Sequence, residues 1–72
     1  MELYAVQNDK GKWLTAKSSW GESWVNDLND AKVYTKVSTA RGQITWYSKR
    51  YSTFHTNKPK VVKLIVTDVQ EV

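Results

Sequence analysis

The sequence predicts a small α+β domain, in which an antiparallel or mixed sheet of three to four strands carries one helix on one face. Three observations lead to this prediction: two β-compatible runs joined by a turn near the N-terminus, a central stretch with helical spacing of apolar residues, and an alternating valine-rich run near the C-terminus. The predicted order is strand, strand, a short third strand, helix, strand. At 72 residues the chain has room for one hydrophobic core, so we expect a single domain over residues 1–72.

The first two strands are predicted to form a hairpin. Residues 3–7 and 12–17 are both rich in β-compatible side chains, and the sequence Asn-Asp-Lys-Gly at residues 8–11 separates them. This cluster is typical of a tight turn, in which glycine adopts the backbone conformation that other residues avoid. We therefore expect an N-terminal hairpin.

The stretch between residues 18 and 30 supports two interpretations. Trp20, Trp24 and Leu28 are spaced four residues apart, which would place them on one face of a short helical turn. The many Ser, Gly, Asn and Asp residues in the same stretch favour instead a loop that its two tryptophans hold in place. Both interpretations remain open from the sequence. Residues 31–37 then alternate in the manner of a strand and predict the short third strand.

Residues 39–51 carry the helical pattern. Four side chains recur at intervals of four, three and four residues: Ala40, Ile44, Tyr47 and Tyr51. This stripe is typical of a helix packed on a sheet. Ser38 or Thr39 is predicted to cap the first turn, because a hydroxyl there can accept a hydrogen bond from an unpaired backbone amide. Gly42 costs a helix about 1 kcal/mol relative to alanine, so we expect the missing side chain to serve a purpose.

Residues 60–69 give the most strongly predicted strand. Residues 52–59 before it form a predicted loop, because proline at position 59 cannot continue a helix. On one face of the strand lie Val62, Leu64 and Val66, and on the other Val61, Ile65 and Val69. Apolar residues on both faces indicate an interior strand or one that is partly covered on both sides.

Composition narrows the class of protein. The absence of cysteine excludes a disulfide scaffold, a thiolate zinc site and a thiol nucleophile. The N-terminal residues lack the basic and apolar regions of a signal peptide, and no apolar run approaches the ~20 residues of a membrane span. We therefore expect a cytoplasmic protein without membrane association. The net charge of +4 modestly favours association with nucleic acid or with an acidic protein.

No catalytic or metal-binding pattern is evident, and neither a cofactor nor enzyme activity is predicted. His55 is the single histidine, and no carboxylate stands at a spacing that would orient it. Serine is plentiful but lies in no Gly-x-Ser-x-Gly turn. Residues 26–30, Asn-Asp-Leu-Asn-Asp, offer clustered oxygen ligands but lack the terminal glutamate of a calcium loop. Consecutive turns in which these side chains bond their own backbone are the favoured interpretation.

An aromatic and basic group of residues lies on the side of the predicted helix opposite its apolar stripe. Its members are Gly42, Trp46, Lys49 and Arg50, with Arg41 on a flank. A tryptophan beside two cations is typical of a contact surface. Trp20 and Trp24 are further binding candidates, because they stand in a stretch rich in Gly and Ser. The alternative is that residues 18–30 fold over the helix and cover Trp46.

The sequence Trp-Val-Asn-Asp-Leu-Asn-Asp-Ala-Lys-Val-Tyr at residues 24–34 is followed by a predicted capped helix with Thr-Ala-Arg-Gly at residues 39–42. This pattern resembles small uncharacterised open reading frames from phages and prophages of Gram-positive bacteria, which share a hairpin, an Asp-Ala-Lys-x-Tyr strand, a helix and a final strand. The resemblance implies an accessory phage protein that acts in the cytoplasm of its host. It implies no activity for any residue.

Two functions follow as hypotheses. The first is a non-enzymatic module that binds a protein partner, preferably an acidic one, through the aromatic and basic group and the tryptophan-bearing stretch. The alternative is a nucleic-acid-binding protein whose cations contact phosphates. The residues predicted for that role are Arg41, Lys49, Arg50, Lys58, Lys60 and Lys63. The partner and the oligomeric state are left open.

Overall fold

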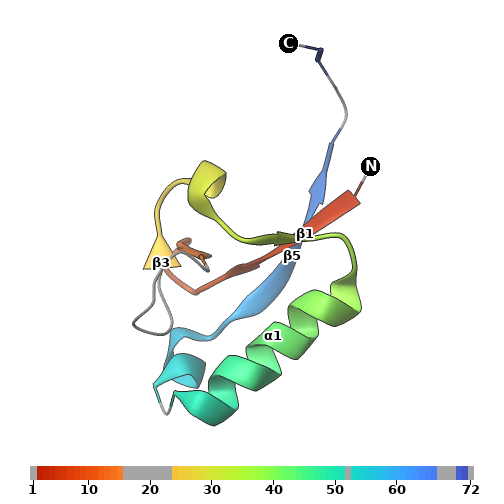
Figure 1. Ribbon diagram of the computed structural model, residues 1–72. Coiled ribbons are helices and arrows are strands. Elements are labelled where there is room, and N and C mark those ends of the chain that lie inside the picture. Colours follow the sequence, from red (N-terminus) through yellow and green to blue (C-terminus); the bar gives the residue numbers. More distant parts are fainter. Residues whose placement is uncertain (1, 16–23, 52, 67–69, 72) are drawn as a thin grey trace.

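The computed structural model describes residues 2–15, 24–51, 53–66 and 70–71. The chain runs through strands β1 (Glu2–Gln7), β2 (Trp13–Leu14), β3 (Trp24–Val25) and β4 (Val33–Tyr34), then helix α1 (Val37–Arg50), then strand β5 (Lys60–Ile65). Two short 3-10 helices, η1 (Leu28–Asp30) and η2 (Phe54–Asn57), precede β4 and β5. The α+β class is confirmed, with one helix lying against a small antiparallel sheet (Figure 1).

Strand β1 is the centre of the sheet. Along one edge it pairs with β5 over its whole length, from Glu2 opposite Ile65 to Gln7 opposite Lys60. Its other edge pairs with β4 in the middle and with β2 at the end, and β2 in turn pairs with β3. Two short strands therefore share one edge of β1, while β5 occupies the other.

The predicted N-terminal hairpin is confirmed, and Asn8 organises its turn. This side chain is 3% exposed, and its Oδ1 accepts hydrogen bonds from the backbone amides of Lys10 and Lys12 at 3.0 and 2.9 Å. Gly11 has a φ of +79°, the left-handed region that glycine enters without a steric penalty. The amide of Asp9 donates to the carbonyl of Asn57 at 3.0 Å, which fastens the turn to η2.

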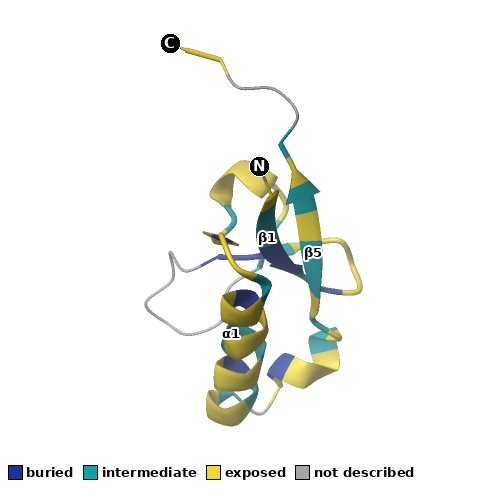
Figure 2. Cartoon of the chain, turned by 90° about the vertical axis from the view of Figure 1, so that its right-hand side faces the viewer, coloured by how far each residue is buried: buried dark blue, intermediate teal, exposed yellow. Residues whose placement is uncertain are grey.

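The core lies between α1 and one face of the sheet. Its buried members are Val6, Leu14, Tyr34, Ala40, Tyr47 and Phe54. Buried and half-buried positions follow one side of α1, whereas the rest of its surface is exposed (Figure 2). The predicted stripe of the helix is thus confirmed, because Ala40 and Tyr47 are buried and Ile44 and Tyr51 pack against the cluster.

Three aromatic rings stack through this core. The Trp24 ring lies 5.6 Å from that of Phe54 at an interplanar angle of 18°, and the Phe54 ring lies 5.3 Å from that of Tyr47 at 23°. Phe54 is fully buried, although it belongs to the stretch predicted as a polar loop. Because η2 turns this one side chain inward, the connection between α1 and β5 supplies part of the core.

The start of the helix was predicted wrongly. Helix α1 begins at Val37, and the N-cap position belongs to Lys36, whose side chain makes no capping hydrogen bond. Ser38 and Thr39 lie inside the first turn instead. The connection from β4 to α1 is only two residues long, so the chain enters the helix before it reaches the hydroxyls that could have capped it.

The strands differ from the prediction in extent and position. The third strand pairs over Val33 and Tyr34 alone rather than over residues 31–37. Strand β5 lies at an edge of the sheet, so the interior-strand alternative was wrong, and the partly covered one was right. Register explains its two apolar faces: Val61 lies on the helix side with Val6, whereas Val62 lies on the opposite face of the sheet with Ala5.

Residues 24–30 do not form the helical turn that was one interpretation of this stretch. Trp24 lies in β3, and Leu28 begins η1. Residues 18–23, Trp20 among them, lie outside the described residues, as does Val69. No helix within the described segments has the length and apolar character needed to cross a membrane.

Candidate binding surface

Trp46 is an exposed aromatic residue that its neighbours hold in place. Its side chain is 45% exposed, so the described residues do not cover it fully. Its ring lies 4.9 Å from that of Tyr47 in an edge-to-face arrangement and 6.5 Å from that of Tyr51. The guanidinium carbon of Arg50 lies 4.9 Å from the Trp46 ring centre, which is cation–π geometry. The indole is therefore ordered although it faces solvent.

The helical repeat decides which predicted residues come together. Gln43, Trp46 and Arg50 follow one another at intervals of three and four residues and so share one flank of α1. Lys49 is exposed on the outer side next to this flank. Arg41 is five positions from Trp46, about 140° around the helix, and points to the other flank. The structure thus groups Trp46, Lys49 and Arg50 and separates Arg41 from them.

Gly42 lies one turn before Trp46 on the exposed side of α1. A Cβ atom at this position would have no neighbouring atom within 4 Å, and the residue keeps ordinary helical geometry. Nothing in the packing of the described residues requires glycine here. The bare position leaves the backbone accessible beside the indole.

Trp24, one of the two other tryptophan candidates, does not join this surface. Trp24 is half-buried in β3, and its ring stacks on Phe54 at the opposite side of the core cluster. Its indole Nε1 is buried and has no hydrogen-bond partner among the described residues, so Trp24 acts as a packing residue. Trp20 belongs to the part of the chain that the structure does not describe.

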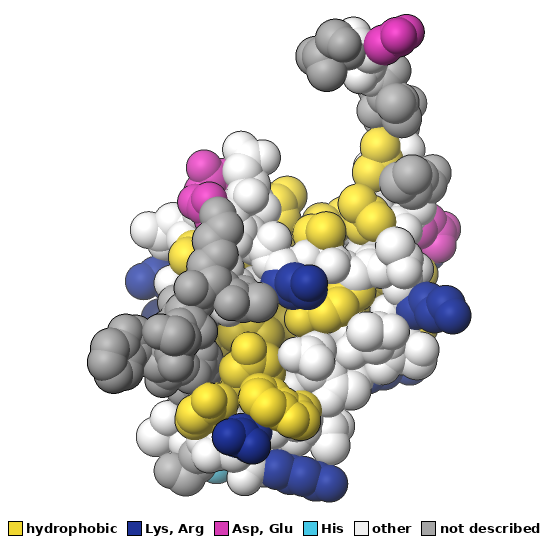
Figure 3. All heavy atoms as spheres, in the orientation of Figure 1, with side chains coloured by type: hydrophobic (Ala, Val, Ile, Leu, Met, Phe, Trp, Pro, Cys, Tyr) yellow, Lys and Arg dark blue, Asp and Glu magenta, His cyan; other side chains and the backbone are white. Residues whose placement is uncertain are grey.

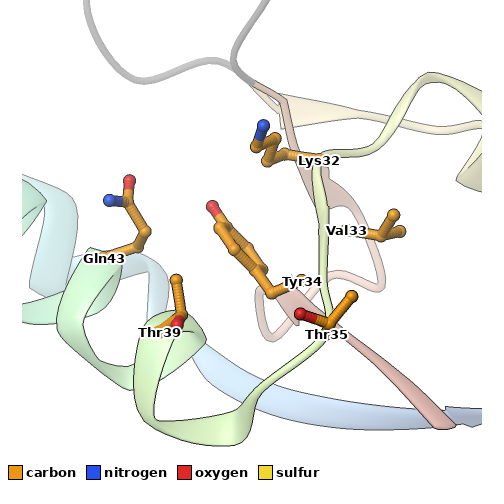
Figure 4. A pocket seen from close by; sticks show the side chains of 6 residues that line it. All are labelled: Lys32, Val33, Tyr34, Thr35, Thr39 and Gln43. Carbon is orange, nitrogen blue, oxygen red and sulfur yellow. The ribbon is translucent and has the colours of Figure 1, made fainter.

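A pocket of about 420 Å³ lies between β4 and the N-terminal half of α1. Figure 4 shows that the Tyr34 hydroxyl projects between the side chains of Lys32 and Gln43. The residues that line the pocket are Lys32, Val33, Tyr34, Thr35, Thr39 and Gln43. Because Gln43 also begins the flank that carries Trp46, the pocket and the exposed indole are neighbours on one surface.

The sequence interpretation missed this pocket. Thr39, Gln43, Trp46 and Arg50 are spaced four, three and four residues apart, so a second stripe beside the apolar one was present as a signal. The contribution of Lys32 and Tyr34 could not be found in this way. It depends on the pairing of β4 with β1, which places these residues opposite the helix.

The Tyr34 hydroxyl stays protonated over a wide pH range. Burial, with a smaller contribution from neighbouring Tyr47, raises the pKa of Tyr34 from its ordinary value of 10.0 to about 12. The phenol is therefore a neutral hydrogen-bond donor at every physiological pH.

Charge is divided sharply along the chain. Residues 31–67 contain eight Lys and Arg residues and no Asp or Glu, and all seven acidic residues lie before or after this stretch. The cationic stretch supplies β4, α1, η2 and β5. In the space-filling view, hydrophobic side chains lie beside Lys and Arg at the lower end of the molecule, where α1 ends (Figure 3). Within this stretch, Lys63 pairs with Glu2 across the sheet at 3.3 Å.

The other sequence candidates have structural explanations. Asp27 Oδ1 accepts a hydrogen bond from the Asn29 amide at 2.9 Å and caps η1, as the turn interpretation predicted. His55 is exposed on η2. Within the described residues, no three acidic, histidine or cysteine side chains are grouped as metal ligands. In comparisons with known proteins, no family model, no curated protein and no solved structure matches the chain.

Proposed function

We propose that this chain is a non-enzymatic binding module that engages an acidic protein partner through the flank of α1 carrying Trp46, Lys49 and Arg50. In keeping with the resemblance to small phage and prophage reading frames, the module acts as an accessory protein in the host cytoplasm. The observation that carries the proposal is an exposed indole fixed by Arg50 at 4.9 Å.

The flank has the composition of an interface hot spot. Trp and Arg are enriched among the few residues that supply most of the affinity in protein interfaces. An ordered side chain loses little conformational entropy when a partner covers it, and the contacts of Trp46 with Tyr47 and Tyr51 supply that order. A partner that covers this indole would bury an apolar surface already in its bound position.

Charge selects the partner. Lys49 and Arg50 end a helix that contains no acidic residue, and three of the elements that contact this helix, β4, η2 and β5, come from the same cationic stretch. Such a field speeds the approach of an acidic surface and repels a basic one. We therefore favour a protein partner with an acidic patch around an apolar or aromatic side chain.

The test begins with capture from a lysate of the source cell and ends with the purified partner. Trp46→Ala is expected to weaken the dissociation constant at least tenfold, and Lys49→Gln with Arg50→Gln to slow association. Ile65→Ala is the matched control, because Ile65 is 68% exposed at the far end of the sheet. Lys10→Gln with Lys12→Gln controls for charge. Equal affinity of Trp46→Ala and wild type would contradict the proposal.

Nucleic-acid binding is the second candidate, and the uninterrupted cationic stretch favours it. Lys58 and Lys60 are exposed beside η2 and could contact phosphates together with Lys49 and Arg50. A single-stranded 20-nucleotide oligonucleotide is the probe. Micromolar affinity that falls steeply between 50 and 200 mM salt would favour this candidate over the first. If the oligonucleotide does not bind at 50 mM salt, the nucleic-acid-binding candidate is excluded.

A further inference from the structure

We propose that the pocket between β4 and α1 binds a carboxylate group of the acidic partner. The pocket lies beside Trp46, which the same partner would cover. This inference rests on the proposed function, because it names the chemical group that the same surface selects. It assigns a role to Lys32, Thr39 and Gln43, which have none in the proposed contact through Trp46, Lys49 and Arg50.

The pocket offers several hydrogen-bond donors. Lys32 contributes an ammonium group, Gln43 an amide, and Thr39 and Tyr34 contribute hydroxyls. None of the described residues that line the pocket is Asp or Glu. Among the described residues, none of these four side chains makes a hydrogen bond or ion pair within the protein. Their donors are therefore available to a ligand.

A carboxylate fits this set better than a cation or a neutral group. An ionised carboxylate accepts several hydrogen bonds at once, and charge-assisted bonds of this kind are about twice as strong as neutral ones. The high pKa of Tyr34 keeps its phenol a donor rather than a competing anion. The Tyr34 ring forms an apolar wall for the methylene groups that carry the carboxylate.

The position of the pocket fixes the spacing of the partner's motif. Gln43 and Trp46 are three residues apart, about 4.5 Å along the helix axis. An extended peptide advances about 3.3 Å per residue. A carboxylate in the pocket therefore places a side chain one or two residues further along over Trp46. The expected motif is a carboxylate within two positions of an apolar residue.

Three octapeptides test the inference. Each is titrated into the isotope-labelled full chain, and binding is followed by NMR. The first has both ends blocked and carries one Glu two positions before a Leu. The second replaces that Glu by Gln and is the neutral control. The third keeps the Gln but ends in a free carboxylate two positions from the Leu. The first and third arms distinguish a side-chain carboxylate from a terminal one.

The expected result is binding of at least one carboxylate peptide, with shifts in the signals of Lys32, Thr39 and Gln43 and of the Trp46 indole. Lys32→Gln and Thr39→Val should each weaken that binding at least fivefold. The matched control Lys10→Gln, an exposed lysine in the hairpin turn, should leave it unchanged. Affinity of the neutral Gln peptide equal to that of both carboxylate peptides, or no binding by any of the three, overturns the inference.

The same titration separates this inference from the proposed function. Shifts confined to Trp46, Lys49 and Arg50, with no effect of Lys32→Gln, overturn the carboxylate pocket and leave the aromatic flank standing. Shifts at the pocket that Trp46→Ala does not weaken support the carboxylate site and contradict the role proposed for the indole.

Discussion

Trp24 and Trp46 stand at two ends of one chain of touching aromatic rings, and their surroundings are opposite. From Trp24 the rings run through Phe54 to Tyr47, and Tyr47 contacts Trp46. At the inner end, even the indole nitrogen of Trp24 is buried. At the outer end, Trp46 is 45% exposed and lies under a cation.

The difference shows that the element, rather than the residue type, decides what a tryptophan does. β3 pairs with β2 and turns Trp24 onto the core, whereas α1 presents Trp46 beside its buried stripe. We infer that the inner end contributes stability and the outer end contributes recognition. The following four predictions test that division.

The largest expected effect comes from the middle of the ring chain. Phe54→Ala should lower the free energy of unfolding by about 3–5 kcal/mol, because a fully buried ring stacked on both sides leaves a cavity when removed. Urea unfolding followed by circular dichroism measures it. Ile65→Ala, at an exposed position, is the control and should change stability by less than about 0.5 kcal/mol. If Phe54→Ala lowers the free energy of unfolding by less than about 1 kcal/mol, the stacked rings do not stabilise the fold as inferred.

Trp46→Ala should cost less stability than Phe54→Ala, about 1–2 kcal/mol. The lost contacts are one cation–π pair and two edge-to-face pairs at a half-exposed site. The same urea experiment measures this cost. If both substitutions destabilise equally, Trp46 belongs to the core, and the division between inner and outer ends is wrong.

Gly42→Ala should raise the free energy of unfolding by about 1 kcal/mol, because a methyl group there meets no atom within 4 Å and alanine favours the helix. Thermal unfolding would show the gain. Unchanged or lower stability would reveal a constraint on Gly42 that its open surroundings do not explain. If the stabilised variant also binds the partner less well, the bare position serves recognition.

The fourth prediction concerns Tyr34→Phe, whose effect on stability should be small at neutral pH. The folded pKa of Tyr34, about 12, exceeds its ordinary value of 10.0. The unfolded chain therefore loses this proton first, and the stabilisation is complete below pH 10 and lost as pH rises towards 12. Urea unfolding at pH 8, 10 and 11 should show a steeper fall for wild type than for Tyr34→Phe. Parallel curves would contradict the raised pKa.

Local patterns predicted the parts of the fold that local interactions form. The turn at residues 8–11 needs only a glycine in the left-handed region and a side chain that bonds its own backbone, and both are present. The stripe of α1 needs only the helical repeat. These elements were predicted correctly.

What the sequence could not predict depends on contacts between distant residues. Phe54 is surrounded in sequence by polar residues, and only the folding of η2 against α1 makes it a core residue. The edge position of β5 depends on which strands pair with β1. The pocket combines Lys32 and Tyr34 with a helix face that follows them, so its signal is divided between two elements.

The pairing of β1 with β5 also has a consequence for folding. Glu2 lies opposite Ile65 and Gln7 opposite Lys60, so these bonds close loops of more than fifty residues. Pairings of such long range cost chain entropy before they return any stabilisation, and they slow the folding of small domains. Strand β1 has neighbours on both edges, so its amide protons are expected to exchange with solvent only through global unfolding. The hydrogens of this strand would therefore report the stability of the whole domain.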